Sequence, residues 1–86
     1  MNIEDFFSSR LRMKILKILS EVGELNISGI ARRLGVNYGT TNKHLKVLEN
    51  EGVVKHKRFG RIRIYRLNTH SPKTKAIQDL LEVWER

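Results

Sequence analysis

Four glycines divide the chain into short segments, and this division constrains its fold more than any other feature. Gly23, Gly35 and Gly52 each follow a stretch with apolar residues at helical spacing, whereas Gly60 lies between two stretches rich in β-branched and aromatic residues. Glycine commonly ends helices and supplies the positive φ of a tight hairpin turn. The pattern predicts three helices followed by a two-stranded hairpin, within 86 residues that have room for one domain.

Residues that cap helices well mark where the expected helices begin. The expected helices run from Ser8 or Ser9 to Gly23, over residues 27–34 after a cap at Asn26, and from a cap at Asn37 to about Glu51. Residues 24–26 are expected to form an extended link, 53–59 and 61–67 the strands, and 68–71 a linker. We therefore expect an α+β fold, mainly α, with a three-helix core over residues 8–67 and its hairpin, and an additional C-terminal helix over residues 71–86.

The net positive charge of the chain comes from residues 30–67. This stretch holds ten Lys and Arg residues against two Glu residues, and its net charge of +8 equals that of the whole chain. A basic field fixed to a helix-turn-helix and a hairpin is typical of proteins that bind double-stranded DNA. Double-stranded DNA is therefore the expected partner.

Composition and motifs argue against several other functions. The chain has no cysteine, and its three histidines, His44, His56 and His70, show no ligand spacing with Asp or Glu. It also has no glycine-rich phosphate loop, no HExxH pair and no nucleophile motif. We expect no enzymatic activity, no cofactor and no metal.

No apolar run approaches the length of a membrane span, and the first residues, MNIEDFF, are acidic where a signal peptide would be basic. We expect a soluble cytoplasmic protein with no membrane partner.

The third expected helix has one apolar side and one polar side. At 100° per residue, Thr41, Leu45 and Leu48 share the buried side, and the opposite side carries no large apolar residue. In a helix-turn-helix, the N-terminal part of the second helix meets base edges in the major groove, where Asn and Lys donate to purines and phosphates. The residues expected to contact DNA from this helix are Asn37, Tyr38, Gly39, Thr40, Asn42, Lys43 and Lys46.

The hairpin is expected to act as a DNA-binding wing, because its cations surround the turn at Gly60. The residues expected to contact DNA from the wing are Lys55, Lys57, Arg58, Arg61 and Arg63. Alternation places Ile62 and Ile64 on one face and Arg63, Tyr65 and Leu67 on the other. Which face packs on the helices stays open at this point.

The last helix is amphipathic, and the DNA-binding unit is nearly complete before it begins at Pro72. Its apolar face therefore favours pairing with a second copy, although such a face is more often part of the core of a single chain. Ile3, Phe6 and Phe7 are expected to form a short helical turn that folds over the core or onto a partner. The residues expected at the homodimer interface are Phe6, Phe7, Ile77, Leu80, Leu81 and Trp84.

Several short segments occur in the order and spacing of a known family. They are residues 12–16 (RMKIL), 26–31 (NISGIA), 34–37 (LGVN), 40–48 (TTNKHLKVL), 51–54 (EGVV) and 64–67 (IYRL). Together they resemble the winged helix-turn-helix of the ArsR-like superfamily, with MarR-type regulators and archaeal relatives close by. The resemblance implies a sequence-specific transcriptional regulator, usually a homodimer joined through its first and C-terminal helices. The chain departs from the metal-sensing members because it lacks their thiolate ligands.

Two other functions suit the same residues. A low-specificity architectural protein would use the same basic field, and Gly39 offers no base-reading side chain. Winged helices also serve as modules that bind protein or RNA.

Overall fold

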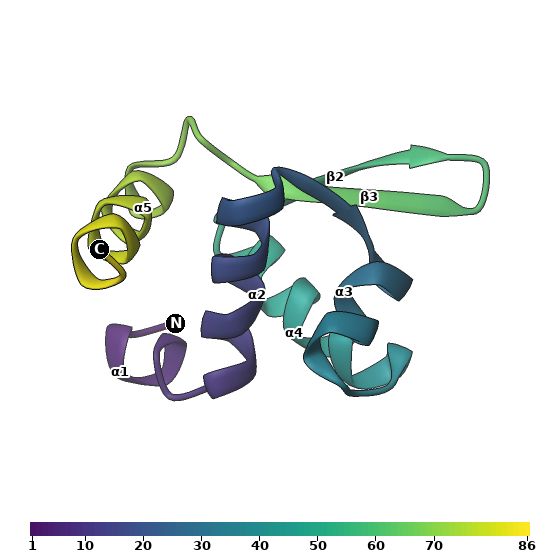
Figure 1. Cartoon of the computed structure of the whole chain (residues 1–86), viewed down its shortest axis with the longest axis horizontal. Helices are drawn as coiled ribbons and strands as arrows, with labels where there is room; N and C mark the ends of the chain where they lie inside the picture. Colours follow the sequence, from purple (N-terminus) through teal and green to yellow (C-terminus); the bar gives the residue numbers. More distant parts are fainter.

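The computed structural model describes all residues, 1–86, as five helices and a small sheet. The elements are α1 (Ile3–Phe6), α2 (Arg10–Val22), β1 (Glu24–Asn26), α3 (Ile27–Leu34), α4 (Tyr38–Asn50), β2 (Val54–Phe59), β3 (Ile62–Leu67) and α5 (Pro72–Trp84). In Figure 1, α2 crosses the middle of the molecule, the β2–β3 hairpin extends to one side, and α1 and α5 lie together at the other end. This is the winged-helix arrangement expected from the sequence.

The helix starts confirm the predicted caps. Ser9, Asn26, Asn37 and Ser71 are all extended, and each accepts a hydrogen bond from the backbone N–H three residues later. Such a bond satisfies one of the N–H groups that a helix start leaves without a partner. Gly35 ends α3 in the left-handed conformation, with φ of 72°, and so turns the chain from α3 into α4.

The sheet differs from the expectation of a two-stranded hairpin. Residues 24–26 form β1, which pairs antiparallel with β3 through Leu25 opposite Tyr65, so the strand order is β1–β3–β2. β3 is therefore the central strand. Its residues 64–66 pair with both β1 and β2, whereas its first residues, next to the hairpin turn, pair with β2 alone. The wing is thus anchored to the chain between α2 and α3.

The core lies where α2, α3, α4, the sheet and α5 meet. Its fully buried apolar side chains are Ile15, Leu16, Leu19, Ile30, Leu45, Leu48, Val53, Val54 and Tyr65. α5 is fixed by Ile77, which is buried, and by the buried hydroxyl of Thr74, which donates to the carbonyl oxygen of Val53 at 3.2 Å. The C-terminal helix therefore packs partly as core, and only the rest of its apolar face is free.

None of the helices combines the length and the apolar character needed to cross a membrane.

Candidate nucleic-acid interface

The predicted polar face of α4 is exposed. Thr41, Leu45 and Leu48 are fully buried, and the Thr41 hydroxyl donates to the carbonyl oxygen of Asn37 at 2.9 Å. Tyr38, Gly39, Lys43 and Lys46 are exposed, and Thr40 and Asn42 are half-buried. Asn37 is itself exposed, and its side chain caps this helix by accepting from the backbone N–H of Thr40 at 2.8 Å.

The strand register resolves which face of the hairpin packs on the helices. Val54 opposite Leu67 and His56 opposite Tyr65 lie on the same face, which continues to Arg58 opposite Arg63 near the turn. Val54, Tyr65 and Leu67 are buried, so this is the inner face.

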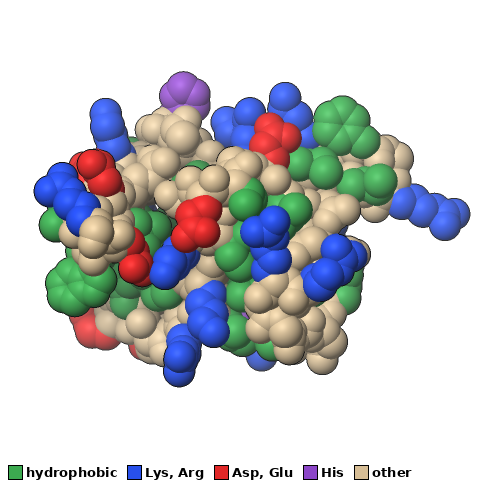
Figure 2. All heavy atoms as spheres, viewed as in Figure 1, with side chains coloured by type: hydrophobic (Ala, Val, Ile, Leu, Met, Phe, Trp, Pro, Cys, Tyr) green, Lys and Arg blue, Asp and Glu red, His purple; other side chains and the backbone are tan.

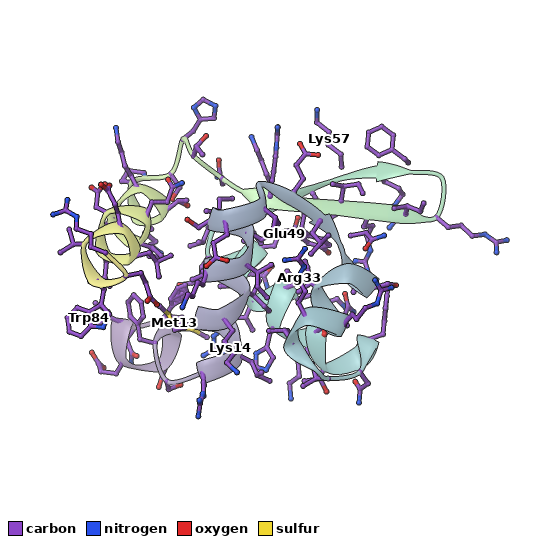
Figure 3. The ribbon with its side chains drawn as sticks, viewed as in Figure 1. Met13, Lys14, Arg33, Glu49, Lys57 and Trp84 are labelled. Atoms are coloured by element: carbon purple, nitrogen blue, oxygen red, sulfur yellow. The ribbon has the colours of Figure 1, made fainter.

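The outer face of the hairpin holds the cross-strand neighbours Lys55 and Arg66, Lys57 and Ile64, and Phe59 and Ile62. Lys57 points away from the helices in Figure 3. The predicted wing residues thus separate into Arg58 and Arg63 on the inner face, Lys55 and Lys57 on the outer face, and Arg61 within the turn. The tip also exposes Phe59 and Ile62, at 62% and 51%, amid these cations.

Arg63 does not extend freely from the wing. Its Nη2 donates to the Tyr38 hydroxyl and to Asn42 Oδ1, each at 3.0 Å, and its Nη1 donates to the Tyr65 hydroxyl at 3.2 Å. The hydrogen bond to Tyr38 is the largest cause of a raised Arg63 pKa, so the guanidinium stays charged. One side chain therefore joins the wing to the exposed face of α4, a link that alternation in the sequence did not reveal.

A second link lies further along α4. His56 Nδ1 is 2.6 Å from Glu49 Oε2, and the His56 ring packs against the ring of Tyr65 with their centroids 5.0 Å apart. Glu49 lies near the end of α4 and His56 lies in β2. The wing is consequently tied to the helix at two points, which fixes their relative orientation.

The other side of α4 contacts α2 through a buried cation. Arg12 is 8% exposed and donates to the carbonyl oxygens of Asp5, at 2.6 Å, and Phe6, at 3.2 Å. Its Nη1 lies 3.4 Å from His44 Nδ1, which accepts because a guanidinium can only donate. Burial, followed by the charges of Arg12 and Lys43, lowers the pKa of His44.

An apolar face is exposed where α1 meets α5, at the end of the molecule away from the wing (Figure 1). Leu80, Val83 and Trp84 form a row on α5 with exposures of 45%, 60% and 79%, and Ile3 and Phe7 add to it from the α1 side. A groove of about 380 Å³ runs between α1 and α5, lined by these two residues and by Ala76, Ile77 and Leu80 among others. Figure 3 shows Trp84 at this end of the molecule.

The structure places two of the predicted interface residues in the core of the single chain. Phe6 and Ile77 are 7% and 5% exposed and belong to the core cluster of a single chain. Leu81 is half-buried against the same cluster. Phe7, Leu80 and Trp84 are exposed, as are Ile3 and Val83, which lie outside the predicted set.

The fold brings together no group of three or more His, Asp or Glu side chains that could hold a metal ion.

Figure 2 shows the distribution of charge over the molecule. Lys and Arg side chains occur over most of the visible face, but toward the end that carries α5 they are mixed with most of the acidic side chains, whereas the hairpin carries Lys and Arg with few acids and extends one of them beyond its turn. The basic region coincides with residues 30–67, which contain α4 and the wing.

This chain is similar to known regulatory proteins. Residues 9–56 match the model of a family described as "Bacterial regulatory protein, arsR family". Over 66 residues the chain is 32% identical to a cadmium resistance transcriptional regulatory protein CadC homolog of Staphylococcus aureus, a match that covers 77% of this chain and 54% of the relative. The chain thus spans about half the length of that curated relative.

Solved structures share the same fold. One is the homodimeric winged helix-turn-helix DNA-binding domain of a possible ArsR-family transcriptional regulator from Mycobacterium bovis, with a TM-score of 0.77 and 26% identity over 94% of this chain and 72% of that chain. Another is HlyU from Vibrio cholerae, with a TM-score of 0.80 and 25% identity over 93% of this chain and 84% of that chain.

The helix-turn-helix with its attached β2–β3 hairpin defines a protein of the winged helix-turn-helix class. Since the family model covers more than half of the residues, the chain belongs to the arsR family of bacterial regulatory proteins, which confirms the resemblance found in the sequence.

Proposed function

We propose that this protein binds double-stranded DNA as a homodimer and regulates transcription at roughly palindromic sites. The observation that carries the proposal is the continuity of the exposed polar face of α4 with a cationic wing that is fixed to it at Arg63 and Glu49. Rigid attachment matters because a helix in the major groove and a wing on the backbone or in the minor groove must dock together.

The recognition helix is α4 in this proposal, and its contacts come from Asn37, Tyr38, Gly39, Thr40, Asn42, Lys43 and Lys46. Lys55, Lys57, Arg58 and Arg61 contribute phosphate or minor-groove contacts from the wing. The relatives support the proposal because the Staphylococcus aureus protein is described as a transcriptional regulatory protein and the Mycobacterium bovis domain as DNA-binding.

The homodimer in this proposal forms through the exposed apolar face of α1 and α5. The Mycobacterium bovis domain is homodimeric and similar over most of this chain, which supports the same assembly here. A two-fold dimer would set the two recognition helices about one DNA turn, ~34 Å, apart.

The charge-removing variants Lys43→Ala and Arg61→Ala test the DNA contacts. Each is expected to weaken binding to any duplex and to make the log–log slope against salt concentration shallower by about 1, because each removes a phosphate contact. Lys75→Ala, an exposed cation on α5, is the matched control. Unchanged duplex affinity in both test variants would refute the proposal.

A low-specificity architectural role is the second candidate, favoured by Gly39 and by the small number of base-reading side chains on α4. Selection from random duplexes separates the two functions, since a regulator returns a sequence motif and an architectural protein does not. A third candidate is a protein-binding module, which the exposed Phe59 and Ile62 at the wing tip favour. If a protein partner still binds after the wing charges are removed, that result would support this role. Cytoplasmic location and the absence of catalysis, cofactor and metal stay predictions.

A further inference from the structure

Arg63 differs from the other cations of the wing in the hydrogen bonds of its guanidinium; Lys55 is also half-buried, but it lies on the outer face. Arg63 is half-buried on the inner face, whereas Lys57, Arg58 and Arg61 are exposed. Both hydrogens on its Nη2 are used within the protein, one by Tyr38 and one by Asn42. A side chain so engaged is poorly placed to act as a free phosphate contact, although the sequence gives it the same character as its neighbours.

The contact with Arg63 fixes the orientation of the Asn42 amide. The two ends of an Asn side chain are alike in shape, and only their hydrogen bonds distinguish them. Because a guanidinium only donates, Asn42 must turn its oxygen toward Arg63 and its NH₂ group away from it. The NH₂ group makes no hydrogen bond within the protein and is not buried, so it keeps two hydrogens to donate.

The contact with Arg63 also defines what Tyr38 can offer. Its hydroxyl oxygen accepts from Nη2, which leaves its own O–H free to donate. Tyr38 is 51% exposed at the start of α4, so this hydrogen is accessible to a ligand. The cluster of Tyr38, Asn42 and Arg63 consequently presents donors to whatever docks on α4.

We propose that Arg63 is a positioning residue that makes Asn42 read a guanine in each half-site. This inference rests on the proposed DNA-binding function. Asn usually reads adenine by donating to N7 while its oxygen accepts from N6. Here the oxygen already holds a hydrogen bond from a cation, and the free NH₂ group matches the adjacent acceptors N7 and O6 of guanine.

The test is selection from a duplex library with 20 random base pairs, carried out with the full chain and its variants. The wild type is expected to select guanine at one position of each half-site, with about tenfold preference over adenine. Arg63→Lys keeps the charge but lacks the planar fork, so it is expected to lose this preference while the salt slope stays unchanged.

Asn42→Asp separates the reading of the base from the integrity of the fold. It keeps an oxygen for Arg63 but has no NH₂ group, so it is expected to lose the guanine preference and keep its melting temperature. In the double variant Arg63→Ala/Asn42→Ala, the selected motif should match that of Asn42→Ala alone, because Arg63 is proposed to act through Asn42.

A motif unchanged in Arg63→Lys, together with a loss of about 1 in salt slope for Arg63→Ala as for Arg61→Ala, would overturn the inference and make Arg63 a phosphate contact. A wild-type protein that selects a motif without guanine at a position sensitive to Asn42 would also overturn it. If the wild type does not bind duplex DNA at all, the proposed function falls, and this inference falls with it.

Discussion

Gly29 and Gly39 both lie in the first turn of a helix, but the space around them differs. A Cβ atom at Gly29 would lie 2.8 Å from Leu25 Cδ1 and 2.9 Å from Asn26 Oδ1, the oxygen that caps α3. A Cβ atom at Gly39 would have only Asn37 Oδ1 near it, at 3.5 Å. Packing therefore requires a glycine at position 29, where α3 begins directly after β1. At position 39, packing would allow a larger residue.

The variants Gly29→Ala and Gly39→Ala are expected to act in opposite directions. The first should lower the free energy of unfolding by about 1–3 kcal/mol, because the added methyl displaces Leu25 and the cap. The second should raise it by up to about 1 kcal/mol through helix propensity, yet weaken duplex binding because Gly39 lies on the proposed DNA-facing surface. Urea unfolding and a duplex titration measure both effects, and equal stability changes in the two variants would contradict this explanation.

His44 makes stability depend on pH. Its folded-state pKa lies below its ordinary value near 6.5 because of burial, and then because of Arg12 and Lys43. As the pH falls below about 6.5, the unfolded chain takes up the proton first, so stability is lost progressively until the folded pKa is passed. Above that range both states are neutral at this position and His44 contributes no pH dependence.

The measurement for His44 is the free energy of urea unfolding between pH 8 and pH 5 in the wild type and in His44→Gln. Glutamine keeps an acceptor for Arg12 but does not titrate, so the variant is expected to lose less stability on acidification. Parallel curves for the two proteins would show that His44 does not carry the effect.

At the scale of single elements, the caps and turns were predictable because they are encoded locally. Asn26, Asn37 and Ser71 cap the helices that the sequence assigns to them, and Gly60 has a φ of 61° in the hairpin turn. β1 was missed because its three residues gain their strand character only by pairing with β3, about forty positions later in the chain. A three-residue extended segment carries no pattern in the sequence that identifies its strand partner.

α5 has two roles that the sequence alone could not separate. Ile77 and Thr74 face the core, whereas Leu80, Val83 and Trp84 face outward, and helical periodicity groups all of the apolar residues in one broad stripe. The side chains of Ile3 and Phe7 extend the outward part of this stripe. An exposed apolar face of this kind usually marks a contact with another chain.

The variants Leu80→Glu and Trp84→Ala test the role of α5 in assembly. Both side chains are exposed, so each change is expected to alter the stability of a folded monomer by no more than about 0.5 kcal/mol. The wild type should have twice the chain mass of 10.1 kDa by light scattering, and the variants should shift toward a single chain mass. Lys75→Glu, at an exposed polar position of α5, is the control. A wild type that is monomeric at all concentrations would refute the proposed interface.

For the molecule as a whole, the sequence predicted where the charge lies but not how it is arranged. Clustering of cations in residues 30–67 is a local property of the chain, and it indicates that α4 and the wing are the elements that bind DNA. Alternation along β3 gives two faces without saying which one packs, so the sequence alone places Arg63 among the wing cations that are expected to contact DNA. Only the burial of Tyr65 and Leu67 assigns its face, and that burial depends on helices distant in the sequence.

The whole molecule then has two ends with different chemistry: a polar and cationic end formed by α4 and the wing, and an apolar end formed by α1 and α5. Buried Arg12 lies between them, since it holds the α1 carbonyl oxygens and contacts His44 on α4. This separation suits a dimer in which assembly and DNA binding use different surfaces.

The cationic surface formed by α4 and the wing is proposed to bind duplex DNA. The most direct measurement is the affinity for a labelled generic duplex across a salt series, with single-stranded DNA and RNA as competitors. Roughly six to eight phosphate contacts predict a log–log slope of about −5 to −7, together with a clear preference for the duplex. Binding that is weak, insensitive to salt or indifferent to strandedness would contradict the claim.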